Sequence, residues 1–411
     1  MPGLDPGISS LSTKTKGSGE ADMTILVAGG GIGGLAAALS LANRGFKVTV
    51  LEQASSLGEI GAGIQIGPNA FHALDHLGVG PAARAKAVYV DGLVLMDAIS
   101  DERVCTIPLD QPFRDRYRNP YAVIHRADLH GVLLEGCRQH AGITLRTATR
   151  VVDYENTASG VVAITQHGER LQARALIGAD GLRSLVRARL VGDGEPVVSG
   201  HTTYRSVIPT EQMPEELRWN AATLWAGPKC HIVHYPLQGW KVFNLVATVH
   251  TDAREAVAGE PVPTDLVRSS FAHVAARPQR IIQAAESWKR WVLCDREPQE
   301  TWIDGHAALL GDAAHPMLQY MAQGACMAME DAVSLGRALA EAGDDIPAGL
   351  EAYRRERLPR TTRLQLASRA MGEYVYHPDG ARRLARNAWL GAKSPTDFYT
   401  SLDWLYGFGA V

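Results

Sequence analysis

The amino-acid sequence predicts an α/β protein in which a helix-flanked parallel sheet carries an inserted, mostly antiparallel sheet and is followed by C-terminal helices. Three observations support this fold class. A short apolar strand near residue 24 runs into a glycine-rich turn and an Ala/Leu-rich helix. Strand-like segments, several with aromatic residues, dominate residues 199–291. Arginine-rich helical patterns fill residues 346–411.

Length and charge restrict the class of protein before any motif is considered. A chain of 411 residues is long enough for a large core and about two or three domains. Its net charge of -3 provides no basic field for nucleic acid or an anionic membrane, so the expected partners are small molecules or a second copy of the chain. The five cysteines are scattered and form no CxxC pair, which favours a reducing cytoplasm and indicates no zinc site.

The N-terminal part of the chain is expected to contain a disordered leader and no membrane span. Residues 1–22 are rich in Gly, Ser, Pro and Lys without periodicity, so we expect the folded protein to start at Met23. Residues 25–42 are apolar enough to suggest a span, but glycines crowd the first half of this segment. Stable membrane insertion is therefore not expected.

The glycine-rich turn has the spacing of a dinucleotide-binding motif. Gly29-Gly30-Gly31-Ile32-Gly33-Gly34 follows the first strand and opens a helix, which is the context that the GxGxxG pattern requires. A second strand is predicted over residues 46–51, and Glu52 follows it, about 20 residues after the turn. The glycines let the backbone approach a pyrophosphate at the helix N-terminus, and the carboxylate can hold a ribose hydroxyl. This unit predicts a Rossmann-like domain that binds FAD or NAD.

The chain after Glu52 departs from regular βαβ repeats. The glycine-dense segment 58–69, which contains Gln65, is expected to be irregular and to wrap the cofactor. His72 and His76 follow at helical spacing. We interpret them as an ordinary helix face, because no third metal ligand lies nearby in the sequence.

Further elements of the nucleotide-binding layer follow in order. A helix is predicted to begin near Arg126, where residue type alone favours a surface charge. Hairpin strands are predicted over residues 151–175. Residues 175–180 form a buried strand that ends at Asp180, before a helix over residues 183–190.

The inserted sheet contains one strand with polar residues in alternate positions. On a strand through residues 230–236, His231 and Tyr235 share one face and His234 lies on the other. His231 and Tyr235 are therefore expected to point into one pocket. On residue type alone, the alternative for His231 is a hydrogen-bonded histidine of the core.

A late stretch, residues 307–335, reads as a strand, a loop and a helix of small residues. The apolar run ends at Gly311-Asp312, and His315 is interpreted as a residue that shapes the loop. Beyond this stretch, the arginines at 353–357 and 382–383 are mixed with acids and are interpreted as a solvated face.

Four motifs occur in a fixed order: GGGIGG with Glu52, HRADL at 125–129, GADGLRS at 178–184 and LLGDAAHP at 309–316. Together they resemble the single-component FAD-dependent aromatic hydroxylases, the family that includes salicylate and para-hydroxybenzoate hydroxylases. The resemblance covers residues 24–335 and implies a para-hydroxybenzoate hydroxylase-like fold. The implied division is an FAD-binding domain at 23–90, 121–198 and 294–345, a substrate domain at 91–120 and 199–293, and a C-terminal helical region at 346–411.

The resemblance also implies the cofactors and their contacts. FAD is expected to bind non-covalently, with Glu52 on the adenosine ribose, Arg126 on the flavin side and Asp312 on the ribityl-phosphate portion. Asp180 is associated with both FAD and the passing nicotinamide. NADH or NADPH is the implied co-substrate, and no metal is implied. The cofactor-binding residues expected on this basis are Gly29, Gly31, Ile32, Gly33, Gly34, Glu52, Gln53, Arg126, Asp180 and Asp312.

The reaction that the resemblance implies is hydroxylation of a phenolic aromatic acid. FAD is reduced by NAD(P)H and reacts with O2 to a flavin C4a-hydroperoxide, whose distal oxygen is transferred to the ring. His231, Tyr235 and Gln319 are the implied catalytic residues, with His231 as the base or hydrogen-bond partner of the phenol. The same three residues and Gln65 are expected to contact the substrate.

The substrate-side segments 61–70, 227–239 and 316–332 look most similar to family members that convert 3-hydroxybenzoate to gentisate. Alternatives within the class are 1-hydroxylation of salicylate and 3-hydroxylation of 6-hydroxynicotinate. Hydroxynicotinate enzymes resemble this chain but have His in place of Gln65 and Pro-His in place of Gln319-Tyr320.

Other classes remain open at this point: an amine oxidase or simple dehydrogenase, and a non-catalytic flavin-binding sensor. The favoured interpretation is a cytoplasmic enzyme of aromatic catabolism. The family and the aromatic tail at residues 404–408 also suggest a homodimer.

Overall fold

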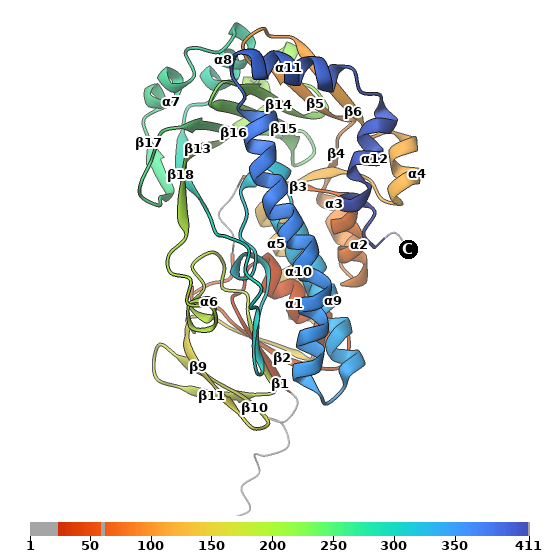
Figure 1. The fold of residues 1–411 in the computed structure, drawn as a ribbon, viewed down its shortest axis with the longest axis vertical. Helices are drawn as coiled ribbons and strands as arrows, with labels where there is room; N and C mark the ends of the chain where they lie inside the picture. Colours follow the sequence, from red (N-terminus) through yellow and green to blue (C-terminus); the bar gives the residue numbers. More distant parts are fainter. Residues whose placement is uncertain (1–23, 59–61, 410–411) are drawn as a thin grey trace, which may run out of the picture.

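The computed structural model describes residues 24–58 and 62–409, so the predicted leader at residues 1–22 lies outside the described residues. Its two largest sheets have six and eight strands. Figure 1 shows the eight-stranded sheet in the upper half of the molecule and the first strands of the six-stranded sheet in the lower half, with helix α10 (Ile346–Met371) running along both. The predicted α/β class is confirmed.

The six-stranded sheet has the strand order β19-β20-β12-β1-β2-β8 and is parallel except for the edge strand β19. Its strands are strongly apolar because helices cover them, and buried side chains of α1, α5 and α9 share one core with them. The strands are β1 (Thr24–Ala28), β2 (Lys47–Leu51), β8 (Ile143–Arg146), β12 (Ala175–Gly178), β19 (Ile303–Asp304) and β20 (Ala307–Leu309). The helices are α1 (Ile32–Ala42), α5 (Arg126–Gln139) and α9 (Gly324–Ala342).

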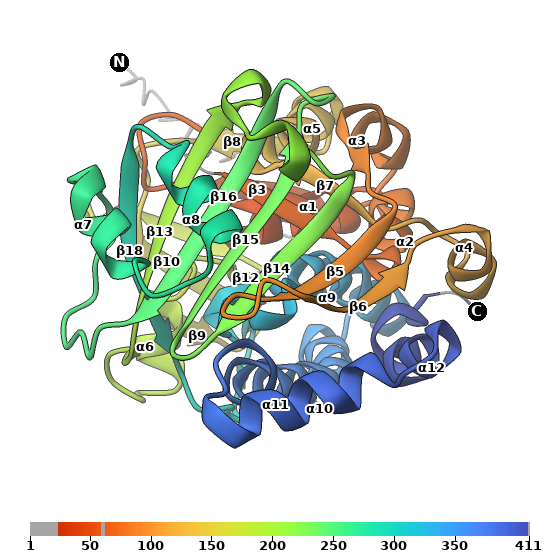
Figure 2. The same ribbon diagram turned by 90° about the horizontal axis from the view of Figure 1, so that it is seen from above.

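The eight-stranded sheet has the order β17-β18-β13-β16-β15-β14-β5-β6, and only the β14–β5 pairing is parallel. Figure 2 shows its long central strands side by side. One face is covered by the short helices α7 (Thr264–Ser270) and α8 (Ala276–Gln283), whose apolar residues pack on Ile232, Leu245 and Ala247. The strands are β5 (Gly92–Asp97), β6 (Arg103–Pro108), β13 (Val197–Pro209), β14 (Ala221–Gly227), β15 (Cys230–Leu237), β16 (Val242–His250), β17 (Ala258–Val262) and β18 (Trp288–Asp295).

Strand register places a set of polar residues on the opposite face of this sheet. His201 pairs with His250 across β13 and β16, and Thr203 pairs with Thr248. His231 on β15 also pairs with Thr248. Because paired residues share a face and the side-chain period is two, Arg205 on β13 and Tyr235 on β15 join the same face.

Two three-stranded sheets complete the β-structure, with the orders β3-β7-β4 and β11-β10-β9. The expectation that residues 58–69 are irregular is wrong over its second half. Residues 63–66 form strand β3 (Gly63–Ile66), which pairs with β7 (Ala122–His125). The sequence around residue 63 did not indicate this strand, because its partner lies far away in the sequence. The other strands are β4 (Val88–Tyr89), β9 (Val151–Thr157), β10 (Gly160–Thr165) and β11 (Arg170–Ala173). The remaining helices of this part are α2 (Pro68–His76), α3 (Gly80–Lys86), α4 (Gln111–Tyr117) and α6 (Leu185–Leu190).

The C-terminal region is helical, as predicted, but its arginines do not form one solvated face. α10 is followed by a π-helical turn (Gly372–Tyr376), α11 (Gly380–Gly391) and α12 (Pro395–Tyr406). Arg357 is fully buried and pairs with Glu330 and Asp331 of α9, so its interpretation as a solvated residue is wrong. Local sequence carries no sign of this pairing, because the acids come from another helix. Among the described residues, no helix is both long enough and apolar enough to cross a bilayer.

The predicted domain boundaries stay predictions. Residues 91–120 and 199–293 do supply strands to one common sheet, although they lie far apart in the sequence.

Candidate active site

One cavity of about 780 Å³ lies where the two large sheets approach each other. Its lining comes from the β1–α1 turn, from the ends of several parallel strands and from the polar face of the eight-stranded sheet. Nearly all of the sequence-predicted site residues line it: Gly29, Gly31, Ile32, Gly33, Glu52, Gln53, Gln65, Arg126, Asp180, His231, Tyr235, Asp312 and Gln319. A cavity of this size can hold a large organic ligand.

The glycine-rich turn fits a dinucleotide because side chains are excluded from it. Gly29 has φ +109°, and a Cβ there would lie 2.3 Å from the carbonyl oxygen of Ala179. Gly34 does not line the cavity; a Cβ on it would lie 1.9 Å from the carbonyl oxygen of Gly29, so it permits helix α1 to pack closely. The turn therefore offers bare backbone at a helix N-terminus, which suits a pyrophosphate.

Glu52 is oriented beside this turn by backbone donors. The amide of Gly30 donates to its Oε2 at 2.7 Å, and the amide of Ala54 donates to its Oε1 at 2.7 Å. These two bonds hold the carboxylate at the end of β2, where it can accept from the hydroxyls of a ribose.

Asp180 and Asp312 both line this cavity but differ in their surroundings. The carboxylate of Asp180 accepts from the Ser184 hydroxyl at 2.5 Å and from the Leu185 amide at 2.8 Å, so it caps α6. Burial raises the pKa of Asp180. Asp312, in contrast, is exposed at the cavity wall.

Beneath the Gly-Asp loop lies a buried ionic network. His315 Nε2 lies 2.5 Å from Asp331 Oδ2, and the Gly311 amide donates to the same oxygen at 3.1 Å. Arg357 Nε donates to Asp331 Oδ1 at 2.7 Å. Burial raises the pKa of Asp331, but His315 and Arg357 outweigh it and bring that pKa to about 2. His315 thus supports the loop, in agreement with its interpretation from the sequence.

Replacing Arg357 with methionine is expected to lower the free energy of unfolding by about 3–5 kcal/mol at pH 7, because two buried carboxylates lose a partner. Asp331 has a depressed pKa in the folded protein, so its contribution to stability is present above the unfolded pKa of about 4 and is lost as pH falls towards 2. The difference in the free energy of unfolding between wild type and Arg357→Met should therefore become smaller as the pH is lowered. Urea denaturation at several pH values measures it. Arg355→Met, an exposed arginine of the same helix, is the matched control, and equal losses in both variants would contradict the prediction.

His231 lies at the substrate side of the cavity with one ring nitrogen already bonded. Its side chain is buried, and Nδ1 lies 2.8 Å from Nε2 of His377. Nε2 is therefore the nitrogen left for a ligand in the cavity. Burial, and secondarily the nearby His201 and His250, lowers the pKa of His231 to about 3, so the ring is neutral at pH 7 and its Nε2 can accept a hydrogen bond.

Tyr235 and Gln65 border the same part of the cavity. The Tyr235 ring packs on the backbone of Gly63, where a Cβ would lie 2.4 Å from the ring. Burial raises the pKa of Tyr235, so its hydroxyl stays protonated and can donate. Gln65 Oε1 accepts from the Tyr121 hydroxyl at 2.5 Å.

Gln319 is held by a clamp on the polar face of the sheet. Its Nε2 donates to the hydroxyls of Thr203 at 3.1 Å and Thr248 at 3.0 Å. Its Oε1 accepts from Arg205 Nη2 at 3.4 Å. The two threonine hydroxyls also lie 2.8 Å apart. The amide orientation is thus set by cross-strand partners that the sequence did not indicate.

Arg205 is the main cavity residue that sequence reasoning missed. No residue of the described chain hydrogen-bonds its Nε or pairs with it as a carboxylate, and its guanidinium lies 5.0 Å from the ring centroid of Trp291. Burial and the neighbouring Arg126 lower its pKa. A partly desolvated guanidinium without an anionic partner is a binding site for a carboxylate. Only the register of β13 could reveal this, because the sequence shows one arginine among strand residues.

A family model described as an FAD binding domain matches residues 22–368, and the chain belongs to that family. Similar curated proteins include 3-hydroxybenzoate 6-hydroxylase 1 of Aquipseudomonas alcaligenes, which is 54% identical over 93% of this chain and 97% of its own length. A 3-hydroxybenzoate 6-hydroxylase of Polaromonas naphthalenivorans is 50% identical over 94% of this chain and 96% of its own. The protein is thus an FAD-dependent aromatic hydroxylase, as the sequence motifs predicted.

Solved structures agree with this family and fold. A salicylate hydroxylase substrate complex has 27% identity and a TM-score of 0.81, covering 95% of this chain and 96% of that one. HpxO of Klebsiella pneumoniae complexed with FAD and uric acid has 26% identity and a TM-score of 0.81, covering 94% and 97%.

Proposed function

We propose that the enzyme hydroxylates 3-hydroxybenzoate to gentisate with NAD(P)H and O2. The observation that carries the proposal is the composition of the substrate side of the cavity. A neutral histidine, a clamped glutamine and an unpaired arginine face one space there, which suits a molecule with a phenol and a carboxylate. The names of the curated relatives, at 54% and 50% identity, support the same substrate.

The cofactor half of the cavity holds FAD in this proposal. Gly29, Gly31 and the first turn of α1 take the pyrophosphate, and Glu52 takes the adenosine ribose. Arg126 contacts the flavin side, and Asp312 the ribityl-phosphate portion. Ile32, Gly33, Gln53 and Asp180 complete the set proposed to contact the cofactor, with Asp180 also serving the nicotinamide. Gly34, which does not line the cavity, serves the cofactor only indirectly, by allowing the turn and helix α1 to pack closely. When bound, FAD supplies electron transfer from NAD(P)H and activation of O2.

The protein's own groups prepare the ring for attack. Nε2 of His231 accepts the phenol proton of the substrate, with Tyr235 and Gln319 beside it as hydrogen-bond partners. Loss of this proton makes the ring carbons ortho and para to the oxygen nucleophilic. In 3-hydroxybenzoate the para carbon is C6, and hydroxylation there yields gentisate. One oxygen atom of O2 enters the ring, the other leaves as water, and NAD(P)H supplies two electrons.

Arg205 orients the ring by its carboxylate. The Arg205 guanidinium donates to Gln319, the residue proposed to orient the phenol, so its positive charge lies beside the phenol site. Its Nε has no hydrogen-bond partner within the described chain and is available to the carboxylate. Fixing both ends of the substrate determines which ring carbon is presented to the oxidant. Gln65 is proposed as a further contact of the substrate, from the wall formed by β3.

A panel of aromatic acids tests the substrate directly. 3-Hydroxybenzoate, salicylate, 4-hydroxybenzoate and 6-hydroxynicotinate are compared for stimulated oxidation of NADH and NADPH, with products identified by mass and NMR. We expect the strongest stimulation with 3-hydroxybenzoate and gentisate as its product. Catechol from salicylate as the main activity would contradict the proposal. A yellow protein that oxidises neither nucleotide with any acid would favour a sensor.

We also propose that the enzyme is cytoplasmic and forms a homodimer. The free state of its five cysteines supports the compartment. The aromatic tail does not support the dimer, since Leu405 and Tyr406 are buried within their own chain. Trp389 and Leu384 on α11, which are 61% and 60% exposed, support it better. Sedimentation velocity measures the mass of the species in solution, and a mass equal to that of one chain would exclude the dimer.

A further inference from the structure

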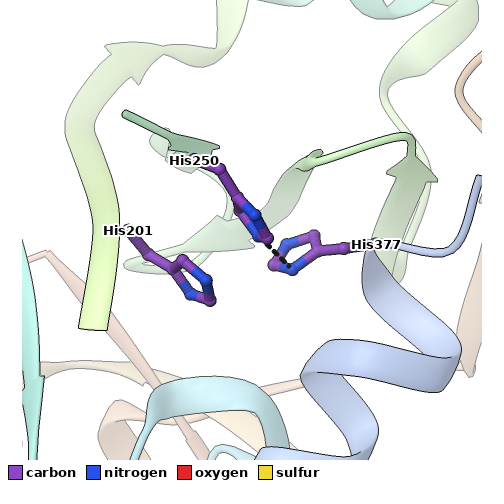
Figure 3. A group of neighbouring side chains, drawn as sticks. All are labelled: His201, His250 and His377. Atoms are coloured by element: carbon purple, nitrogen blue, oxygen red, sulfur yellow. Dashed lines mark hydrogen bonds between the residues drawn. The ribbon is translucent and has the colours of Figure 1, made fainter. Parts of the chain in front are cut away.

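His231 is the inner end of a chain of three imidazoles that come from distant parts of the sequence. His231 Nδ1 lies 2.8 Å from His377 Nε2, and His377 Nδ1 lies 2.9 Å from His250 Nε2. Figure 3 shows the second contact as a dashed line, with His201 beside it. His231 belongs to β15 and His250 to β16, whereas His377 follows the π-helical turn after α10. We call His231, His377 and His250 the imidazole chain.

The two contacts link the tautomers of the three rings, so that one donor order runs through the whole imidazole chain. A neutral imidazole has one N–H donor and one acceptor nitrogen, so each contact needs one donor and one acceptor. If His231 Nδ1 donates to His377, then His377 Nδ1 must donate to His250. This arrangement leaves an acceptor, His231 Nε2, at the cavity and an N–H, at His250 Nδ1, at the outer end. His231 and His377 are buried and His250 is partly exposed, so the chain leads from the cavity towards solvent.

The surroundings keep these rings neutral. Burial lowers the pKa of all three, to about 3 for His231, and neighbouring imidazoles lower the pKa of His231 and His377 further. Lys229 also lowers the pKa of His250, while Asp252 raises it. His201 stacks on His250 with centroids 3.9 Å apart, and its Nδ1 is bonded to the Tyr320 hydroxyl. Within the described residues, no carboxylate hydrogen-bonds any of these rings, so no fixed anion traps a proton along the chain.

A metal ion is the competing interpretation of the same residues. Ligand nitrogens of His201, His250 and His377 all lie within 4.8 Å of one another. Metal ligation requires that their lone pairs converge on one point. The planes of the His201 and His250 rings are 14° apart with centroids separated by 3.9 Å, so their lone pairs lie in two nearly parallel planes, which disfavours convergence on one ion. The spacing of 2.9 Å between His250 and His377 is that of a hydrogen bond.

We propose that the imidazole chain carries the phenol proton of the substrate from the cavity to solvent, a role that rests on the proposed function. His231 Nε2 takes the proton from the phenol oxygen as its Nδ1 passes a proton to His377 Nε2. His377 Nδ1 passes a proton to His250 Nε2, and His250 Nδ1 releases one to water. One proton enters and one leaves, and each ring ends as the other neutral tautomer. The reverse passage, or ring rotation, resets the chain.

His377→Gln tests the relay, because glutamine can donate and accept hydrogen bonds but cannot exchange tautomers. FAD-loaded enzyme is mixed with 3-hydroxybenzoate in weak buffer containing a pH indicator. The absorbance of the bound phenolate and of the indicator report the proton leaving the phenol and reaching solvent. Relative to wild type, we expect His377→Gln to slow both signals by about tenfold or more, with affinity for the substrate changed by less than about threefold. His250→Gln should slow the indicator signal similarly.

Two further variants separate proton transfer from structural damage. Free imidazole is expected to restore the rates in His377→Ala, where it can fill the gap, but not in His377→Gln. His76→Gln, an exposed histidine of α2, is the matched control and should behave as wild type.

Several outcomes would overturn the relay. Wild-type rates of both signals in His377→Gln would do so, as would a wild-type enzyme that hydroxylates 3-hydroxybenzoate without releasing a proton on binding. One tightly bound metal ion per chain, whose removal abolishes proton release, would assign the histidines to a metal site. If 3-hydroxybenzoate is not hydroxylated at all, the proposed function fails instead, and the relay is then judged with the acid that the panel identifies.

Discussion

Replacing His231 with alanine is expected to lower kcat for 3-hydroxybenzoate by about 100-fold to 10,000-fold, because the phenol loses the base that accepts its proton. The fraction of NADH oxidised that yields gentisate should fall as well, since a neutral phenol is a poor nucleophile. Reduction of the flavin and binding of FAD should change little. Stopped-flow absorbance and product quantification measure these quantities separately.

His234 provides a matched control for this variant. It is a buried histidine of the same strand, but it points to the opposite face and neither of its ring nitrogens is hydrogen-bonded within the described chain. His234→Leu should therefore keep both kcat and the yield of gentisate. An undiminished rate and unchanged coupling in His231→Ala would show that His231 is not the base.

Arg205→Met is expected to raise KM for 3-hydroxybenzoate by about tenfold to 100-fold, the equivalent of losing a charge-assisted hydrogen bond of about 1.5–3 kcal/mol. The mechanism is the loss of the cation that pairs with the carboxylate. A substrate without this charge, 3-hydroxybenzyl alcohol, should be bound equally by variant and wild type. The ratio of kcat/KM for the acid to that for the alcohol is therefore the decisive measurement.

Arg290 supplies the comparison within the same sheet. It lies on β18 opposite Tyr204 and pairs with Glu260 at the surface, away from the cavity lining. Arg290→Met should leave the ratio of acid to alcohol unchanged. If Arg205→Met also leaves that ratio unchanged, another group recognises the carboxylate, and Arg205 serves only to position Gln319.

Much of the cofactor half could be predicted from the sequence because its signals are local. The glycines of the β1–α1 turn, Glu52 at the end of β2 and Asp180 at the end of β12 each follow an apolar strand directly. In a parallel sheet such strand ends meet at one edge, so order along the chain is enough to bring them together. His231 and Tyr235 were placed on one face by the period of two within a single strand.

Other parts could not be predicted because they depend on pairing between distant segments. The strand β3 forms only because β7 offers an edge to pair with. The interpretation of Arg357 as a solvated residue failed because two acids of α9 surround it in the interior. His377 lies in a region that the sequence predicted only to be helical and rich in arginine, and no spacing in that region points to His231.

The sequence by itself determined the family, the cofactor and the class of reaction, because the order of four short motifs is a property of the chain alone. It also determined that His231 and Tyr235 share one face of β15. Only the tertiary structure decided which polar groups are left without partners in the cavity and which are linked to solvent. Arg205, Gln319 and the imidazole chain converge through strand register and the path of the C-terminal helices. Both are set by non-local packing, which leaves no periodic trace in the residues concerned.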